Sequence, residues 1–392
     1  MQTTNTTTTS ALGLSWHNAY TKLRQFISHT PSIEISSNKA LIPGDVKEEF
    51  YRLFDDVRVS FVKDYCPDVT ECGLELSQQY KAVCAGIISE AGFDSIAISA
   101  DLKWFLENPI DGLIRFLFDP LFKFLAGQID AKEFEQVASL KITDAFAILF
   151  RDGYQRWVAL SIIRRLLPDK SYRFPVIDAL QDCLMGEGHE VPGQHKDEVP
   201  EAKEVRDISF DQHSIVSFVA PRATIHSRRT GNFVALHTDF REAEWTASRR
   251  SPDMEWHEIA ALKTEYRLLK IRPDLIKKEW YELAPVLPDM ALYTAGDVNN
   301  LALVSDFKYM LRPEINIAVM ESSGWDEKVK LEDLKRRLLA LNPRQGAFVI
   351  CREELSPTAV AAFGNEDGLR LLHVGYDEST LEALASLISP PS

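Results

Sequence analysis

Two carboxylates and one lysine lie within a short stretch of the chain, at a spacing that suits phosphodiester hydrolysis. Asp289 follows Pro288, and Asp306 is separated from Lys308 by Phe307 alone. Because side chains alternate between the two faces of a strand, Asp306 and Lys308 point the same way if this segment is extended. Pairing of this strand with the one after Asp289 would bring both carboxylates and the ammonium group to one end of a hairpin.

This grouping favours metal-dependent chemistry. Carboxylate oxygens are the ligands that hard divalent cations such as Mg²⁺ or Mn²⁺ prefer. A bound cation neutralises charge on a phosphate and lowers the pKa of its water, and a nearby lysine orients that water and stabilises the transition state. The backbone carbonyl of Phe307 is a further candidate ligand. Helical segments before the hairpin offer three candidate carboxylates: Glu265, Glu279 and Glu282.

The run of Pro288-Asp289, sixteen residues and Asp306-Phe307-Lys308 resembles the motif of PD-(D/E)xK nucleases, and its local sequence is similar to McrC-type restriction nucleases. The resemblance covers only about Pro288 to Tyr309. It implies that Asp289 and Asp306 bind the metal and that Lys308 is the catalytic lysine. It also implies a restriction-endonuclease-like fold and an endonuclease that cleaves nucleic acid, DNA in the first instance, in a restriction or other defence system.

A second alignment assigns the strands of that fold differently. It places three strands in a meander, followed by a helix and one more strand: Met290–Tyr293, Leu301–Met310, Ile315–Met320, then Leu331–Leu341 and Phe348–Cys351. In this alignment Glu321, directly after the third strand, becomes an additional metal ligand.

The motif is short, and both halves recur elsewhere. Pro-Asp occurs four more times and Asp-x-Lys five more times. The alternative interpretation is an ordinary hairpin with a surface Asp–Lys pair, which stabilises a fold by about 0–1 kcal/mol. The alternative function is therefore a non-enzymatic interaction or scaffold protein, including one with a decayed nuclease fold.

Charge bears on both hypotheses. The net charge is −14 and the isoelectric point is near 5.2, which does not suit non-specific binding to phosphates along the whole surface. The segment from Arg222 to Lys278 carries more basic than acidic residues. It supplies four candidate nucleic-acid-binding residues: Arg228, Arg229, Arg249 and Arg250. The alternative for these arginines is a solvated face.

Hydrophobic periodicity predicts a helical N-terminal half. From Val46 to Val62, apolar residues recur every three or four positions, which is the period of one helix face. Further helices are expected over three segments: Leu74–Ala91, Ile110–Ala126 with a break at Asp119-Pro120, and Thr143–Leu167. This half is expected to bind a substrate or a protein partner, because no catalytic grouping stands out in it.

The C-terminal half alternates strands with helices, which is typical of an α/β domain. Strands are expected over Ser214–His226 and Phe233–Thr246, around a turn at residues 228–232, and again at Leu371–Val374. Short helices are expected at Thr358–Phe363 and Thr380–Leu387. Segments Asp253–Lys270 and Leu275–Leu283 have helical periodicity.

The expected fold is thus multidomain, α plus α/β, with a C-terminal mixed sheet. The boundaries follow composition: a tail at 1–12, a helical domain at 13–185, a polar linker at 186–206, and an α/β domain at 207–392 with the candidate nuclease core at about 253–352. Five cysteines without a CxxC spacing favour free thiols in a reducing compartment. No signal peptide or membrane span is expected, so a cytoplasmic location without membrane contact is predicted.

Overall fold

The computed structural model describes residues 15–36, 39–174, 202–210, 223–238, 288–301, 312–329, 331–339, 342–363 and 368–388. The chain divides into two compact units, each built from two stretches of sequence. The first unit holds Met1–Lys81 and Ala100–Tyr154, and the second holds Ala82–Ser99 and Gln155–Ser392. The division falls inside two long helices, α3 (Pro67–Ala91) and α7 (Ala131–Arg165).

The first unit is helical, as the periodicity predicted. Besides parts of α3 and α7, its described elements are α1 (Ser15–His29), β1 (Glu34–Ser36), β2 (Lys39–Leu41), α2 (Lys47–Tyr65), α4 (Ala100–Glu107), α5 (Pro109–Ile114), the 3₁₀ helix η1 (Arg115–Leu117) and α6 (Phe118–Leu125). In α2, the expected apolar face is buried, with Phe50, Phe54 and Phe61 fully inside. Burial of such a face, rather than intrinsic propensity, supplies most of the stability of a helix in a folded protein.

An aromatic cluster holds three helices of this unit together. Trp16 of α1 lies 5.6 Å from Phe61 of α2 and 5.3 Å from Phe134 of α7, measured between ring centroids, and Phe61 lies 5.2 Å from Phe134. The tilted and edge-to-face geometries match the preferred arrangement of aromatic rings, which adds about 0.5–1.5 kcal/mol for each pair. All three side chains are buried.

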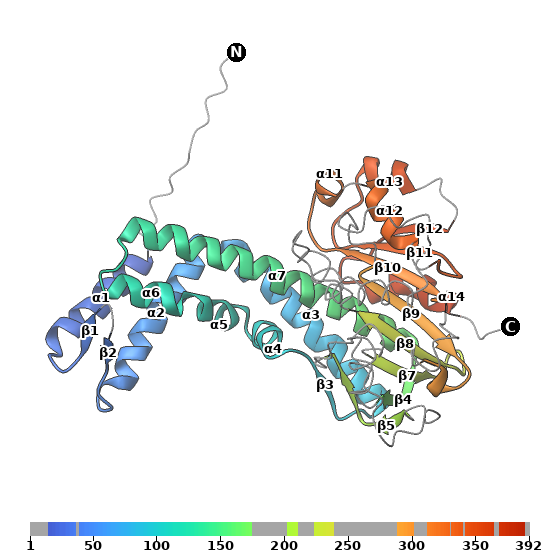
Figure 1. Ribbon diagram of the computed structural model, residues 1–392, viewed down its shortest axis with the longest axis horizontal. Coiled ribbons are helices and arrows are strands. Elements are labelled where there is room, and N and C mark those ends of the chain that lie inside the picture. The colour runs from blue at the N-terminus through green and yellow to red at the C-terminus, as the bar shows by residue number, and fades with distance from the viewer. Residues whose placement is uncertain are drawn as a thin grey trace, which may run out of the picture. The chain divides into compact units, whose positions relative to one another are not determined.

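The second unit contains an eight-stranded mixed sheet within the described residues (Figure 1). Its strands are β4 (Pro168–Arg173), β5 (Lys203–Val205), β7 (Ala223–Ser227), β8 (Phe233–Thr238), β9 (Met290–Ala295), β10 (Ile315–Met320), β11 (Ala347–Cys351) and β12 (Leu369–His373). Their spatial order is β12-β11-β10-β9-β8-β7-β4-β5. A separate parallel pair joins β3 (Ser95–Ala97) to β6 (Asp207–Ser209).

The sheet changes from antiparallel to parallel at β10. Neighbours from β5 to β10 are antiparallel, whereas β10, β11 and β12 run parallel. The parallel strands need crossover connections, and these contain α11 (Trp325–Lys328), α12 (Leu331–Leu339) and α13 (Pro357–Phe363). The expected hairpin around residues 228–232 is confirmed as β7–β8. The predicted combination of a helical N-terminal half and a C-terminal mixed sheet is also confirmed.

Helices α12 and α13 cover one face of the sheet at β10, β11 and β12 (Figure 1). Leu334 and Leu338 of α12 and Phe363 of α13 pack with alternate residues of these strands in one hydrophobic cluster. Asn316 of β10 lies on the same face and donates through Nδ2 to the carbonyl of Leu338, at 2.6 Å. This face matters below, because Asp289 belongs to it.

Two segments belong to the large sheet although the sequence placed them in the helical domain and in the linker. Pro168–Arg173, within the range expected as helical, is strand β4 of the large sheet, and Lys203–Val205, within the expected linker, is strand β5. After the last strand come the 3₁₀ helix η5 (Glu378–Leu381) and the helix α14 (Glu382–Leu387). A further 3₁₀ helix, η4 (Val298–Leu301), follows β9.

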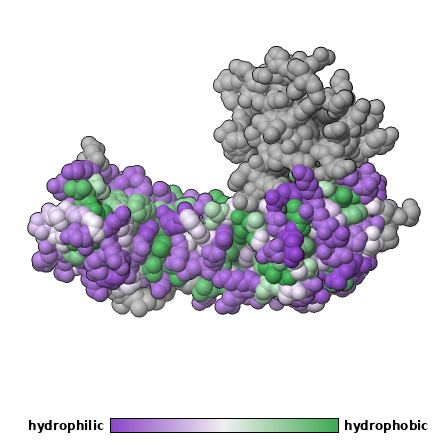
Figure 2. Space-filling view, turned by 90° about the horizontal axis from the view of Figure 1, so that it is seen from below, coloured by the Kyte–Doolittle hydropathy of each residue, from purple (hydrophilic) through white to green (hydrophobic). Residues whose placement is uncertain are grey.

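The described surface is largely polar on the face shown in Figure 2, where hydrophobic residues form small separate patches. Among the described helices, none combines the length and the apolar character needed to cross a membrane.

Candidate functional site

Asp289 stands at the start of β9, and both of its carboxylate oxygens have partners. Oδ2 accepts a hydrogen bond from the backbone N–H of Val319 in β10, at 2.8 Å, and Oδ1 accepts one from the Arg337 guanidinium of α12, at 3.3 Å. The side chain of Asp289 is 8% exposed. A carboxylate this buried requires such compensation, because losing water costs a charged group several kcal/mol.

The β10 residues beside Asp289 are apolar. The register pairs Met290 with Ile317, which sets Asp289 opposite Ala318. Ala318 and Val319 are buried and carry no oxygen in their side chains. Glu321 follows the end of β10, and its backbone carbonyl accepts from Arg352 Nε at 2.7 Å.

Both alignments pair β9 with a strand at Leu301–Met310, most of which lies outside the described residues, and in the described sheet both sides of β9 are occupied. β9 and β10 pair directly, and the remaining neighbours of these strands are β8 and β11. In the described sheet, no other strand lies between β9 and β10. Leu301 is the last residue of a 3₁₀ helix rather than the first residue of a strand. The meander is formed instead by β8, β9 and β10, and it leads into α12 and then into β11, parallel to β10.

Several predicted site residues fall outside the described residues. These are Asp306, Phe307 and Lys308 of the motif, the helix carboxylates Glu265, Glu279 and Glu282, and the arginines Arg249 and Arg250. Within the described part of the chain, no three His, Cys, Asp or Glu side chains gather closely enough to hold a metal ion. Of the proposed metal ligands, Asp289 and Glu321 lie among the described residues, whereas Asp306 and Phe307 lie outside them.

Arg228 and Arg229 occupy the turn between β7 and β8. Arg228 donates through its backbone N–H to the carbonyl of Leu167, at 3.1 Å. Arg229 is paired with Glu382 of α14 and donates to the hydroxyl of Ser386, at 2.7 Å. The guanidinium of Arg229 is thus engaged within the second unit, and its side chain is only 25% exposed.

Two residues near Asp289 escaped the sequence analysis. Arg337 had no motif to mark it, because only the packing of α12 onto the sheet brings it to Asp289. His237 of β8 is paired with Ala291, so its side chain lies on the same sheet face as Asp289. His237 is buried, with its ring 5.0 Å from the ring of Tyr293. Burial raises the pKa of the Tyr293 phenol, so the tyrosine stays neutral.

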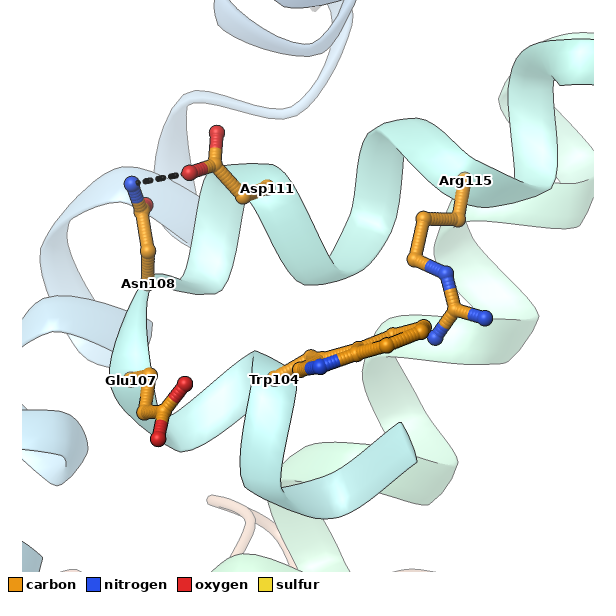
Figure 3. Close-up of a pocket in the computed structure, with 5 residues that line it drawn as sticks. All are labelled: Trp104, Glu107, Asn108, Asp111 and Arg115. Atoms are coloured by element: carbon orange, nitrogen blue, oxygen red, sulfur yellow. Dashed lines mark hydrogen bonds between the residues drawn. The ribbon is translucent and has the colours of Figure 1, made fainter. Parts of the chain in front are cut away.

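The first unit carries a separate recess of about 330 Å³ between α4 and α5, lined by Trp104, Glu107, Asn108, Asp111 and Arg115 (Figure 3). The two helices approach closely because residue 112 is glycine; a Cβ there would lie 2.6 Å from the Cα of Phe105.

Trp104 is the aromatic surface of this recess and is 44% exposed. The Arg115 guanidinium stacks on its indole, with Cζ 3.3 Å from the ring centroid, and donates to Asp101 at 2.8 Å. On the α5 side, Asn108 donates to Asp111 at 2.7 Å (Figure 3). The lining carries charges of both signs, so it selects no particular class of ligand.

Comparison with known proteins returned no match: no protein-family model, no curated protein and no solved structure is similar to this chain.

Proposed function

We propose that the second unit is a metal-dependent phosphodiesterase that cleaves nucleic acid, DNA in the first instance. The observation that carries the proposal is the position of Asp289. It opens a central strand of a mixed sheet, next to the end of β10. The order β8–β9–β10, then α12, then parallel β11 also supports the proposal, because the resemblance implies a meander followed by a helix and a further strand.

In this proposal, Asp289 and Asp306 hold Mg²⁺ or Mn²⁺, with the Phe307 carbonyl and Glu321 as further ligands. The chemistry that the bound cation supplies is neutralisation of phosphate charge and activation of water. Lys308 orients the water and stabilises charge on the phosphate. Asp289 takes part only when its Oδ1 exchanges Arg337 for the cation, since that oxygen is engaged by the guanidinium.

A second candidate function is favoured by one observation. The β10 residues next to Asp289 are Ala318 and Val319, and the carboxylate itself is satisfied by protein donors. This arrangement is typical of a structural ion pair. It supports a non-enzymatic interaction or scaffold protein in which a nuclease fold has lost its chemistry, with the helical unit as the partner-binding part.

Cleavage and metal binding together separate the two candidates. Purified protein is incubated with supercoiled plasmid, linear DNA or RNA, with Mg²⁺, Mn²⁺ or EDTA, beside Lys308→Ala, Asp289→Asn and the control Lys170→Ala. Lys170 is a half-exposed lysine on β4 of the same sheet. The nuclease predicts metal-dependent cleavage that Lys308→Ala abolishes and Lys170→Ala retains.

Calorimetric titration with Mn²⁺ reports on the site without requiring turnover. The nuclease predicts binding that Asp289→Asn weakens. If Lys308→Ala cleaves as strongly as the wild type, the catalytic role assigned to Lys308 is refuted. Absence of both cleavage and Mn²⁺ binding would refute the nuclease and leave the interaction protein.

A further inference from the structure

Helix α7 presents an apolar stripe to solvent along the part that belongs to the first unit. Val137, Leu140 and Ile148 are 36%, 63% and 51% exposed, which makes Leu140 the most exposed large hydrophobic residue among those described. Their spacing puts all three on one side of the helix. The adjoining side of the helix is buried, with Phe134, Ala138, Ile142 and Ala145 in the core.

Charged residues flank the stripe in a symmetrical order. Counting outwards from the centre between Ile142 and Thr143, Lys141 is matched by Asp144, Val137 by Ile148, and Glu133 by Arg151, to within one residue. Lys141 thus has the opposite charge, and Val137 an apolar side chain, at the same distance on the other side of the centre. Arg151 lies one residue short of the mirror position of Glu133, which is Asp152, and the mirror position of Leu140 is the buried Ala145.

We propose that α7 docks against α7 of a second copy of this chain, antiparallel, about a two-fold axis near residues 142 and 143. Such an axis superimposes each position on its mirror position in the partner. It brings Lys141 to the partner's Asp144 and Val137 to the partner's Ile148, each twice. Glu133 and the partner's Arg151 then form an ion pair at each end of the contact.

The charges select this arrangement over a parallel one. A parallel pair in register would set Lys141 against Lys141 of the other copy and Asp144 against Asp144, and such like-charge contacts are unfavourable. The pairs that these residues make within one copy are weak competitors. Lys141 lies 4.0 Å from Asp119, with both side chains about half exposed, and Arg151 lies 3.4 Å from Asp152. Exposed pairs of this kind contribute about 0–1 kcal/mol.

The occupant of the stripe is a second copy because the complementarity lies within one sequence. A single helix pair buries less surface than a standard interface, so association is expected at micromolar rather than nanomolar concentrations. The inference is independent of the nuclease, because α7 supplies none of its proposed ligands.

Sedimentation velocity of the full chain, from about 1 µM to about 200 µM, tests the proposal. The wild type is expected to dimerise reversibly. Leu140→Glu, which places a carboxylate in the stripe, is expected to weaken the dimer by about tenfold or more. The matched control is Leu41→Glu on β2, because Leu41 is also exposed, at 46%, but lies outside α7. The control is expected to dimerise like the wild type.

A charge swap tests the antiparallel register. Lys141→Asp sets two carboxylates together twice across the axis, so dimerisation is expected to weaken by about tenfold. Adding Asp144→Lys reverses both signs and is expected to restore it to within about threefold. Circular dichroism checks that each variant keeps its helices. A wild type that stays monomeric throughout, a dimer indifferent to Leu140→Glu, or a swap without restoration would each overturn the proposal.

Discussion

Arg337 donates to Asp289 across the layer between α12 and the sheet, with 3.3 Å between Nη2 and Oδ1. The helix thereby supplies the positive charge that the buried carboxylate needs, and the N–H of Val319 supplies the second donor. Both carboxylate oxygens of Asp289 consequently have protein partners even without a metal. Any cation that binds there must compete with a guanidinium that is already in place.

Replacing Arg337 by alanine tests this competition. Loss of the donor leaves Asp289 with one partner, and the free energy of unfolding is expected to fall by about 1–3 kcal/mol. If Asp289 belongs to a metal site, Mg²⁺ or Mn²⁺ should then raise the melting temperature more in Arg337→Ala than in the wild type, because binding to the native state stabilises it. Thermal unfolding with and without the cation measures both effects.

The control for this variant is Arg336→Ala. Arg336 is the neighbouring residue on α12, and its only described ion pair is an exposed one with Asp333, at 3.2 Å. Its loss is expected to change stability by no more than about 0.5 kcal/mol. Equal destabilisation by both variants would contradict a specific role for Arg337.

Gly86 and Arg164 form a coupled pair in the second unit. A Cβ at Gly86 of α3 would lie 2.5 Å from Cζ of Arg164, whose guanidinium also pairs with Glu90 and Glu378. In an Arg164→Ala background, Gly86→Ala should stabilise the protein by about 1 kcal/mol, the usual difference between these residues inside a helix. In the wild type, this gain should disappear, because the guanidinium must move away from its carboxylates.

A four-variant cycle in urea measures this coupling. Arg164→Ala alone is expected to cost about 1 kcal/mol, since its ion pairs are partly exposed. The interaction energy between the two sites is expected to be about 1 kcal/mol. Additive effects would show that the two side chains accommodate each other freely.

Cys351 gives the protein a predictable response to alkaline pH. Burial raises the pKa of its thiol from 9.0 to about 12, and a hydrogen bond with Trp325 lowers it in part. Because the folded-state pKa is the higher one, the stabilisation is complete below pH 9 and is lost as pH rises from about 9 towards 12. Cys351→Ser lacks this ionisation and should lose stability less steeply over that range.

Thiol labelling checks the same residue independently. In the native state at pH 8, Cys351 should resist a thiol reagent, whereas the partly exposed Cys66, Cys72 and Cys84 should react. Rapid labelling of Cys351, or parallel stability curves for the wild type and Cys351→Ser, would be inconsistent with a buried neutral thiol.

The elements with strong internal patterns were predictable from the sequence. Strand β10 spans the predicted residues, and the apolar face of α2 is the one that its periodicity indicated. The start of α7 was predicted too late, because its first turns combine apolar and charged residues. The structure begins it after Asp130, whose Oδ1 accepts from the backbone N–H of Glu133 at 2.8 Å, as an N-cap does.

The elements that were missed depend on partners distant in the sequence. Strands β4 and β5 have polar sequences, PDKSYR and KEV, and alternate residues show no apolar face. They are strands because they pair with each other and because β4 pairs with β7. The same limit applies to the candidate site. A motif indicated Asp289, but its contact with Arg337 arises only from the packing of α12 on the sheet.

The pairing of β3 with β6 bears on the order of events during synthesis. Ser95 pairs with Asp207, so the earlier strand leaves the ribosome long before its partner exists. At roughly 5–20 residues per second, β3 waits for several seconds, longer than any strand of the large sheet waits for its neighbour. The second unit must therefore complete its fold after β6 has been translated, and until then the edge of β3 lacks its partner strand.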